Sequence, residues 1–322
     1  MGERGASRNQ PGPVKLVAHS RAMRGLLRQA RRYAGVDATV LLTGETGVGK
    51  DALARFLHYS GPRRGEPFVT VDCPGLPDTL VESELFGHER GAFTDATAAR
   101  PGRFELAGRG TLYLDAITRL SPSGQGALLR VVEERRVMRL GGTIASDVRA
   151  RIIASADAGV DEAVREGFLR PELYHRLSVL PLHVPPLRER TDDILPLAQL
   201  FVAEVSARLH RPPPGFDAGA QDALLRYRWP GNVRELRHVL ERALVAGLGD
   251  TIRVSDLPLD VLEFDEASLA PAGATRPTLE QVERRYIELT LQYARGNQTR
   301  AAAILGISRK ALWEKRKRYG LR

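Results

Sequence analysis

The sequence of 322 residues predicts a parallel α/β domain that is followed by two smaller helical segments. Three observations favour this class. Short apolar runs alternate with helical patterns in the first half of the chain, a glycine-rich loop stands between such a run and a helix, and the later segments carry helical patterns alone. With 43% apolar, 27% charged and 6% aromatic residues, the composition excludes a disordered chain, a collagenous fibre and a disulfide scaffold.

The cysteine content indicates the cellular compartment. The single cysteine, Cys73, cannot form an intramolecular disulfide or join a cysteine metal cluster, which is typical of a protein in a reducing compartment. No apolar run approaches the ~18 residues of a membrane span. We therefore expect a cytoplasmic protein without a membrane partner.

The first 185 residues contain the expected sheet. Residues 1–14 are polar and contain glycine and proline, which predicts a flexible tail. Four apolar runs within residues 15–185 have the length and composition of buried strands and are separated by helical spacing. They lie at residues 39–43, 68–71, 111–114 and 151–154. This order is typical of a parallel sheet covered by helices.

The remaining chain is expected to be helical. Residues 186–262 are predicted to form a helical subdomain, with helical patterns at residues 194–209, 218–227 and 233–246. Residues 263–278 are rich in Ala, Gly, Pro, Ser and Thr, which predicts a linker. Residues 279–322 then form a small all-α domain.

A glycine-rich loop follows the first expected strand and precedes a helical run. Such a loop surrounds phosphate with backbone N–H groups and a helix N-terminus, while its lysine reaches the terminal phosphates. The loop consists of Gly44, Glu45, Thr46, Gly47, Val48, Gly49, Lys50 and Asp51. Asp51 is a departure, because Ser or Thr normally holds Mg²⁺ at this position. The sequence thus predicts a phosphate-binding loop, with an ordinary glycine-rich turn as the alternative.

The third expected strand, at residues 111–114, runs directly into Asp115. In P-loop enzymes a carboxylate in this place helps to hold Mg²⁺. An apolar run that ends in an acid is weak evidence alone, but the phosphate-binding loop strengthens it. Asp115 is therefore the candidate metal ligand.

Three longer segments carry a family resemblance. Residues 84–96 read ELFGHERGAFTDA, residues 186–190 read PLRER, and residues 229–236 read WPGNVREL. With the phosphate-binding loop, these motifs closely resemble those of the AAA+ bacterial enhancer-binding proteins, the ATPases that activate RNA polymerase carrying sigma-54. The resemblance runs from about residue 17 to the last residue. It implies an AAA+ P-loop domain with a helical lid, ATP and Mg²⁺ as cofactors, and assembly into a hexameric ring.

The resemblance also implies roles for single residues. Lys50 would bind the β- and γ-phosphates, Asp115 would act through the metal, and Arg234 would sense nucleotide from the lid. Arg170 and Arg176 stand where the family places arginines that reach the γ-phosphate of the neighbouring subunit. The alternative for these two arginines is surface charge on a helix.

Three residues around the expected catalytic site depart from the family pattern. The residue after Asp115 is Ala116, where the family has the glutamate that polarises the attacking water. General-base help contributes about 10²–10⁴-fold in rate, so we expect binding without most of the turnover. Asp72 replaces an asparagine that restrains this glutamate, and Asp157 replaces a sensor asparagine.

Two interpretations of the new aspartates stay open. In the first, the pocket is no longer selected for hydrolysis. In the second, Asp72 or Asp157 supplies the missing carboxylate from another side, although a carboxylate beside a polyphosphate is repelled unless a cation screens it. Phosphate release that Asp72→Asn or Asp157→Asn abolishes would support the second interpretation.

Residues 91–96 match the loop with which the family contacts sigma-54, apart from one position. The loop consists of Gly91, Ala92, Phe93, Thr94, Asp95 and Ala96, and Asp95 replaces a glycine. Asp restricts the backbone more than Gly, although it tolerates the left-handed region better than most residues. Since Phe93 and Thr94 are retained, we expect contact with sigma-54; the alternative is a hairpin tip without a partner.

The last 44 residues hold most of the net charge of +9, with eleven basic and four acidic residues. Two helical runs are separated by Gly306 and a cap at Ser308, which is helix-turn-helix spacing and is similar to the Fis-type module that ends the family's chains. The candidate DNA contacts are Arg300, Ser308, Arg309, Lys310, Glu314, Lys315 and Lys317. A solvated basic face or a purely structural helical cap is the alternative.

These observations lead to one function and two rivals. We expect a sequence-specific DNA-binding regulator of the sigma-54 activator class that binds ATP and hydrolyses it weakly or not at all. Its expected partners are an enhancer-type DNA site, RNA polymerase with sigma-54, and copies of itself in a dimer and a hexamer. In the first rival, ATP serves only assembly on DNA. In the second, the chain joins mixed rings with an active relative and donates Arg170 and Arg176.

No receiver or sensory domain precedes the expected ATPase domain in this sequence. We therefore expect regulation to come from a partner, from nucleotide, or from a segment outside this sequence.

Overall fold

The computed structural model describes residues 15–76, 80–93, 96–247, 249–257, 278–294 and 297–320. The chain divides into two units, Met1–Glu189 and Arg190–Arg322, which are described separately. The expected tail and residues 263–277 of the expected linker lie outside the described residues.

The first unit is built around a five-stranded parallel sheet with the strand order β2-β5-β8-β1-β9. The strands are β1 (Val40–Thr43), β2 (Phe68–Asp72), β5 (Thr111–Asp115), β8 (Arg151–Ala156) and β9 (Leu180–His183). The first four confirm the expected strands. The fifth was not predicted because Pro181 interrupts its apolar pattern; proline is tolerated there because β9 is an edge strand.

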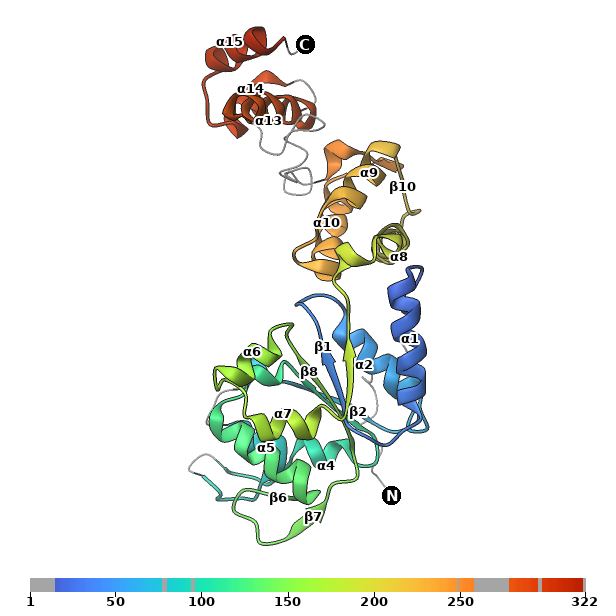
Figure 1. The fold of residues 1–322 in the computed structure, drawn as a ribbon, viewed down its shortest axis with the longest axis vertical. Coiled ribbons are helices and arrows are strands. Elements are labelled where there is room, and N and C mark those ends of the chain that lie inside the picture. The colour runs from blue at the N-terminus through green and yellow to red at the C-terminus, as the bar shows by residue number, and fades with distance from the viewer. Residues whose placement is uncertain are drawn as a thin grey trace. The chain divides into compact units, whose positions relative to one another are not determined.

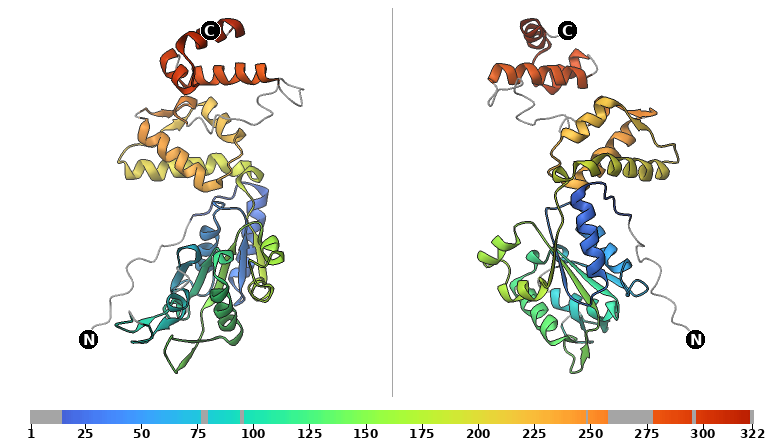
Figure 2. Two further views of the ribbon diagram at one scale, coloured as in Figure 1. Left: turned by 90° about the vertical axis from the view of Figure 1, so that its left-hand side faces the viewer. Right: turned by 45° about the vertical axis from the view of Figure 1, so that its right-hand side comes forward.

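Helices cover both faces of this sheet (Figures 1 and 2). On one face, Val40, Tyr113 and Ile153 pack in a core with α1 (Arg21–Ala34) and α2 (Lys50–Tyr59). On the other face, alternate strand residues such as Leu41, Leu112 and Ile152 pack against five helices. These are α3 (Val81–Phe86), α4 (Arg103–Ala107), α5 (Pro122–Glu134), α6 (Val160–Arg165) and α7 (Pro171–Leu177). Burial on both faces explains why the strands read as continuous apolar runs.

Two short antiparallel pairs extend the first unit. One joins β3 (Gly87–His88) to β4 (Arg100–Pro101), and the other joins β6 (Arg136–Met138) to β7 (Ala145–Asp147). Gly87 is needed in the first pair, because its φ is +82° and a Cβ there would lie 2.5 Å from the Arg100 carbonyl oxygen. The short 3₁₀ turns of this unit are η1 (Cys73–Gly75), η2 (Ile117–Arg119) and η3 (Leu187–Glu189).

The second unit begins with three helices that confirm the predicted helical subdomain. They are α8 (Ile194–Arg208), α9 (Ala218–Arg226) and α10 (Asn232–Ala246), preceded by η4 (Thr191–Asp193). Residues between and after them form a small parallel pair, β10 (Gly215–Phe216) with β11 (Thr251–Ile252), and then η5 (Val254–Asp256). Trp229 of the WPGNVREL segment is fully buried, and its Nε1–H donates to the Leu224 carbonyl oxygen at 2.9 Å.

The C-terminal helices are α13 (Leu279–Tyr293), α14 (Gln298–Ile304) and α15 (Arg309–Tyr319). They share a small core of Ile287, Leu291, Ala294, Ala301, Ala302, Leu312 and Tyr319. Among the helices that the structure describes, none is long and apolar enough to cross a bilayer.

Candidate functional site

The phosphate-binding loop connects β1 to α2, and its glycines permit its shape. Gly44, Gly47 and Gly49 have φ values of 144°, 81° and 102°, a region that other residues adopt only with strain. A Cβ on Gly44 would also lie 2.6 Å from the Val184 carbonyl oxygen. Gly49 is the N-cap of α2, so the loop leads directly into a helix N-terminus, where backbone N–H groups favour an anion.

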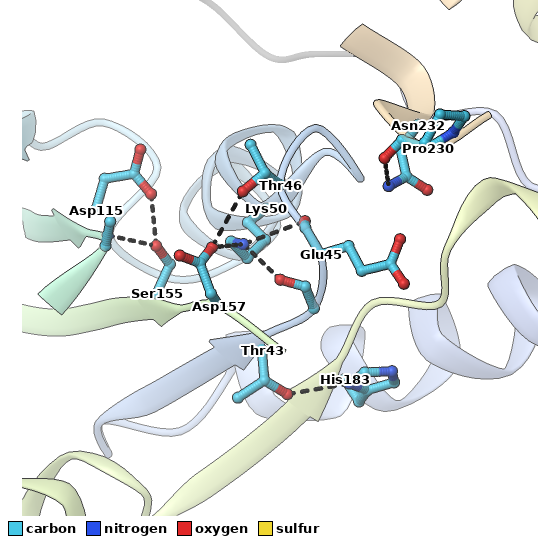
Figure 3. Close-up of polar contacts among 12 residues, drawn as sticks. Thr43, Glu45, Thr46, Lys50, Asp115, Ser155, Asp157, His183, Pro230 and Asn232 are labelled. Carbon is cyan, nitrogen blue, oxygen red and sulfur yellow. Dashed lines mark hydrogen bonds and ion pairs between the residues drawn. The ribbon is translucent and has the colours of Figure 1, made fainter. Parts of the chain in front are cut away.

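Lys50 is the buried cation of this loop. Its side chain is 9% exposed, and its Nζ donates to the carbonyl oxygens of Gly44 at 2.6 Å and Glu45 at 3.2 Å. The third bond, at 3.2 Å, goes to Oδ1 of Asp157, which follows the end of β8 (Figure 3). The Thr46 hydroxyl donates to the same carboxylate oxygen at 3.3 Å.

Asp115 stands at the end of β5 and is held by two buried neighbours. Its Oδ1 accepts a hydrogen bond from the Tyr113 hydroxyl at 2.9 Å. It also accepts one from the Ser155 hydroxyl at 2.5 Å (Figure 3). Ser155 in turn accepts the backbone N–H of Ala116 at 2.8 Å. Burial and the nearby Asp115 charge raise the pKa of Tyr113, so its hydroxyl remains a donor. These bonds orient the carboxylate and tie β5 to β8.

Ala116 itself lies in the left-handed region, with φ 55° and ψ 57°. Its side chain, next to the end of β5, is a single methyl group. No acid or base is therefore present at the position where the resemblance places the catalytic glutamate.

Asp72 lies beside Asp115 at the carboxyl ends of the strands, since the two residues are paired in the register of β2 and β5. Cys73 follows it and is buried. Burial, together with the charges of Asp115 and Asp72, raises the pKa of the Cys73 thiol to about 12. The carboxyl ends of β2 and β5 therefore carry two carboxylates, while Lys50 donates to the carboxylate of Asp157, which follows β8.

Two other acidic residues of the loop are bound by arginines. Asp51 accepts two hydrogen bonds from Arg55 of its own helix, at 2.9 and 3.2 Å. Glu45 accepts two from Arg188 of the PLRER segment, at 2.6 and 2.9 Å. The loop is thus connected through Glu45 to the last residues of the first unit.

The three arginines implied by the resemblance are exposed. Arg170 is the N-cap of α7, and its backbone N–H donates to Gln125 of α5 at 2.9 Å. The Arg176 guanidinium, on the same helix, lies 3.1 Å from a carboxylate oxygen of Glu133. Arg234 lies in the first turn of α10 in the second unit.

Residues 91–93 and 96 lie in the connection between β3 and β4. The Gly91 N–H donates to the Ala96 carbonyl at 2.8 Å, and the Ala96 N–H donates to the Phe93 carbonyl at 3.0 Å. The Phe93 ring is 36% exposed and packs edge-on against His88, with 4.9 Å between the ring centroids. Thr94 and Asp95 lie outside the described residues.

This turn is attached to the β6–β7 pair. Leu140 exchanges backbone hydrogen bonds with Gly87 and Glu89, and Arg139 binds the carboxylates of Glu89 and Glu105. The two neighbouring loops therefore form one connected surface.

The C-terminal helices have the expected turn geometry. Ser308 accepts the Ala311 N–H at 3.1 Å as the N-cap of α15, and Gly306 has a φ of 65°. Most of the candidate DNA contacts are exposed: Arg300, Ser308, Arg309, Lys310, Glu314 and Lys317. Lys315 instead forms an ion pair with Glu283 of α13, which also accepts the Tyr319 hydroxyl at 2.5 Å.

Trp313 is a surface feature of α15 that sequence reasoning missed. Its side chain is 55% exposed, and the Lys317 ammonium lies 5.5 Å from its ring centroid. The sequence could have indicated this residue, because an aromatic side chain among basic ones on a predicted recognition helix is a candidate DNA contact.

Three family models match the chain in order. A sigma-54 interaction domain matches residues 16–183, an AAA+ ATPase lid domain matches residues 188–273, and the Fis family of bacterial regulatory proteins matches residues 278–319. The first match alone covers more than half of the sequence.

The chain belongs to the sigma-54-dependent transcriptional regulators with a Fis-type helix-turn-helix. The match to the lid model and the parallel sheet show the AAA+ fold that the resemblance implied.

Several curated proteins are similar over nearly the whole chain. The nitric oxide reductase transcription regulator NorR1 of Cupriavidus necator is 44% identical over 341 residues, which cover 98% of this chain and 66% of the relative. The regulatory protein AtoC of Escherichia coli K12 is 41% identical, with 95% and 68% covered. The chain spans 66% and 63% of the lengths of NorR1 and NorR2 of C. necator.

A solved structure is similar over nearly the whole chain. NtrX from Brucella abortus, in complex with ATP, superimposes with a TM-score of 0.73 at 31% identity, covering 95% of this chain and 70% of NtrX. NtrX has also been solved with ADP, with a TM-score of 0.72.

In this sigma-54 regulator, the structure brings together residues that motifs place far apart. Lys50 and Asp157 meet, as do Asp115 and Ser155. The sequence analysis did not identify Tyr113 and Ser155. Each is a polar residue within a mostly apolar strand, and this pattern could have indicated a buried hydrogen bond.

Proposed function

We propose that this protein is a DNA-binding transcriptional regulator of the sigma-54 activator class that binds ATP in its phosphate-binding loop and hydrolyses it weakly or not at all. The observation that carries the proposal is the combination of a glycine-rich loop that holds the buried Lys50 with Ala116 beside Asp115. The loop has the features that binding requires, whereas the neighbouring position lacks the group that activates water.

The residues of the loop fit a nucleoside triphosphate. The positive φ values of three glycines, the helix N-terminus after Gly49 and the buried Lys50 form the usual donor set for phosphate. Mg²⁺ is normally bound by one or two carboxylates together with substrate phosphates, and Asp115 supplies one such carboxylate. When bound, the metal would neutralise phosphate charge.

The DNA-binding part of the proposal rests on α14 and α15. The N-terminal turn of α15 carries exposed Arg309 and Lys310, and this is the part of a recognition helix that lies nearest the base edges. Trp313 adds an exposed apolar surface to the same helix. We propose that these residues contact an enhancer-type DNA site.

Contact with RNA polymerase carrying sigma-54 is a further part of the proposal. Phe93 is partly exposed in a turn that hydrogen bonds and packing against His88 support. A DNA-bound assembly that presents this turn would engage sigma-54 in the ATP state.

Nucleotide affinity and phosphate release, measured together on the purified chain, test the proposal. We expect saturable binding of ATP or its non-hydrolysable analogue, loss of binding in Lys50→Ala, and phosphate release about 10²-fold or more below that of a relative that retains the glutamate, under the same conditions. In Ala116→Glu we expect release to rise. Turnover of the unaltered chain equal to that of such a relative would contradict the proposal.

A second candidate is a subunit of mixed rings. The exposed guanidinium groups of Arg170 and Arg176 on α7 favour it, because their availability does not depend on the chain's own hydrolysis. Mixing the chain with a relative that retains the glutamate tests this candidate. Stimulated release that Arg170→Ala in this chain removes would support it, and release that simply falls with dilution would contradict it.

A further inference from the structure

The hydrogen-bond capacity of Lys50 is fully used within the chain. An ammonium group has three N–H donors and no acceptor. The structure provides three oxygen acceptors: the carbonyls of Gly44 and Glu45, and the carboxylate of Asp157. A phosphate oxygen that binds Lys50 must therefore replace one of these three partners.

The carboxylate is the partner in direct competition with phosphate. The two carbonyl oxygens belong to the phosphate-binding loop itself and move only when the loop changes shape. The Asp157 side chain is 38% exposed and lies on a different segment, after β8. It is also the single anion of the three, so it already supplies the negative charge that a phosphate would bring.

Asp157 engages a second donor of the loop as well. Its Oδ1 accepts the Thr46 hydroxyl in addition to Lys50 (Figure 3). One carboxylate oxygen thus occupies two donors that a terminal phosphate would use. An amide oxygen at this position could accept the same bonds but would carry no charge.

We propose that Asp157 is an internal competitor of the γ-phosphate and makes this site favour ADP over ATP. This inference rests on the proposed nucleotide binding. The lysine of such loops reaches the terminal phosphates, so ATP must displace the carboxylate from Lys50 and then hold its γ-phosphate beside a displaced negative charge. ADP offers Lys50 only its β-phosphate, which can take the place of one loop carbonyl oxygen while the Lys50–Asp157 pair is kept.

The surroundings of the pair increase this discrimination. Asp115 ends β5, the strand next to β8, so a displaced Asp157 carboxylate meets further negative charge there. Asp51 and Glu45 are already bound by Arg55 and Arg188. Lys50 is the cation that both the carboxylate and the γ-phosphate require.

Isothermal titration with ADP and with a non-hydrolysable ATP analogue, both with Mg²⁺, tests the inference. In the unaltered chain we expect a lower Kd for ADP. In Asp157→Asn we expect the Kd of the analogue to fall about tenfold or more, while the Kd of ADP changes by less than about threefold. Asp72→Asn is the matched control, since it removes the same charge at the same edge of the sheet, and its preference for ADP should remain.

The outcomes separate this inference from the proposed function. An unchanged ratio of the two Kd values in Asp157→Asn, with ADP binding intact, overturns the inference alone. The inference is also overturned if Asp157→Asn increases the affinity for both nucleotides equally, or if Asp72→Asn increases the affinity for the ATP analogue selectively. Either result would show a general effect of charge. Absence of binding of either nucleotide to the unaltered chain overturns the proposed function together with the inference.

A measurement without nucleotide provides an independent readout. Asp157→Asn leaves the buried Lys50 without its counter-charge, so the melting temperature of the free protein should fall by about 2–4 °C. A cooperative melt verifies that the variant is folded. An unchanged or higher melting temperature overturns the claim that the ion pair holds Lys50 in the free protein.

Discussion

At the scale of single residues, Ala116 combines a side chain that has no acid or base with backbone strain. A residue other than glycine in the left-handed region costs about 1 kcal/mol or more. The backbone is held there because the Ala116 N–H is bound to Ser155, which is fully buried. The backbone of Ala116 thus has a fixed left-handed conformation although its side chain has no acid or base.

The strain predicts the effect of a glycine at this position. Ala116→Gly removes the unfavourable contact of the Cβ, and we expect the free energy of unfolding to rise by up to about 1 kcal/mol, because the gain is partly offset by the entropy of the unfolded chain. Denaturant unfolding measures this difference. Ala127→Gly, in the middle of α5, serves as the control and should be destabilising. A destabilised Ala116→Gly variant would contradict the assignment of strain.

The buried His58 should make the stability of the first unit depend on pH in acid. Its side chain is 1% exposed, its Nδ1 lies 2.9 Å from the Thr111 hydroxyl oxygen, and burial lowers its pKa. The charges of Arg151 and Arg63 lower this pKa further, while the Glu66 carbonyl opposes them. The unfolded chain therefore binds the proton more readily than the folded protein.

The sign of the pH effect follows from that difference. The stability contribution of His58 is complete above its ordinary pKa of 6.5 and is lost as the pH falls through the lower pKa of the folded state. Each unit of pKa difference corresponds to about 1.4 kcal/mol. We expect the unfolding free energy of His58→Gln to depend less on pH below 6.5 than that of the unaltered chain. Parallel pH profiles would contradict this prediction.

At the scale of elements, the ion pair between α13 and α15 divides the basic residues into two groups. Lys310 is exposed, whereas Lys315 is bound to Glu283. Lys310→Ala should weaken DNA binding and reduce the slope of log K against log salt by about 1, because one phosphate contact is lost. Lys315→Ala should change this slope less and should lower the stability of the C-terminal helices.

Affinity titrations at several salt concentrations, with thermal melts, measure both effects. An equal reduction of the slope in Lys310→Ala and Lys315→Ala would show that Lys315 leaves Glu283 on DNA. That result would contradict the division into two groups.

Trp313 offers a direct signal for contact between α15 and DNA. The chain has two tryptophans, and Trp229 is fully buried in the second unit, so a change in fluorescence on adding DNA should come from Trp313. We expect quenching that Trp313→Phe removes and Trp229→Phe retains. Trp313→Ala should weaken specific binding about tenfold, because apolar contact with bases is lost. Unchanged fluorescence with saturating DNA would contradict this contact.

At the scale of the whole molecule, assembly should depend on α7. We expect an ATP analogue to increase the sedimentation coefficient, and Arg170→Glu to require about tenfold more protein for the same assembly. Arg165→Glu is the control, because Arg165 is 71% exposed on the adjacent helix and pairs with Glu162 of its own helix. Equal loss of assembly in both variants would contradict a specific role of Arg170.

Much of the fold was predictable because it depends on local patterns. Four of the five main strands and the helices α8, α9 and α10 begin and end within two residues of the predicted positions. The caps at Ser308 and the turn at Gly306 were predicted from residue type alone. Strand β9 was missed because its proline is acceptable only at a sheet edge, and the edge is a property of the complete sheet.

The sequence by itself determined the family, the glycine-rich loop with its lysine, the alanine after Asp115 and the basic C-terminal helices. These features follow from residue types at fixed short spacings. The tertiary structure alone decided which partners these residues have: Lys50 binds Asp157 across 107 positions, Ser155 holds Asp115 across 40, and Glu283 binds Lys315 across 32. Such partners cannot be read from the sequence, because parallel strand order and helix packing bring distant residues together and then set the charge that each one meets.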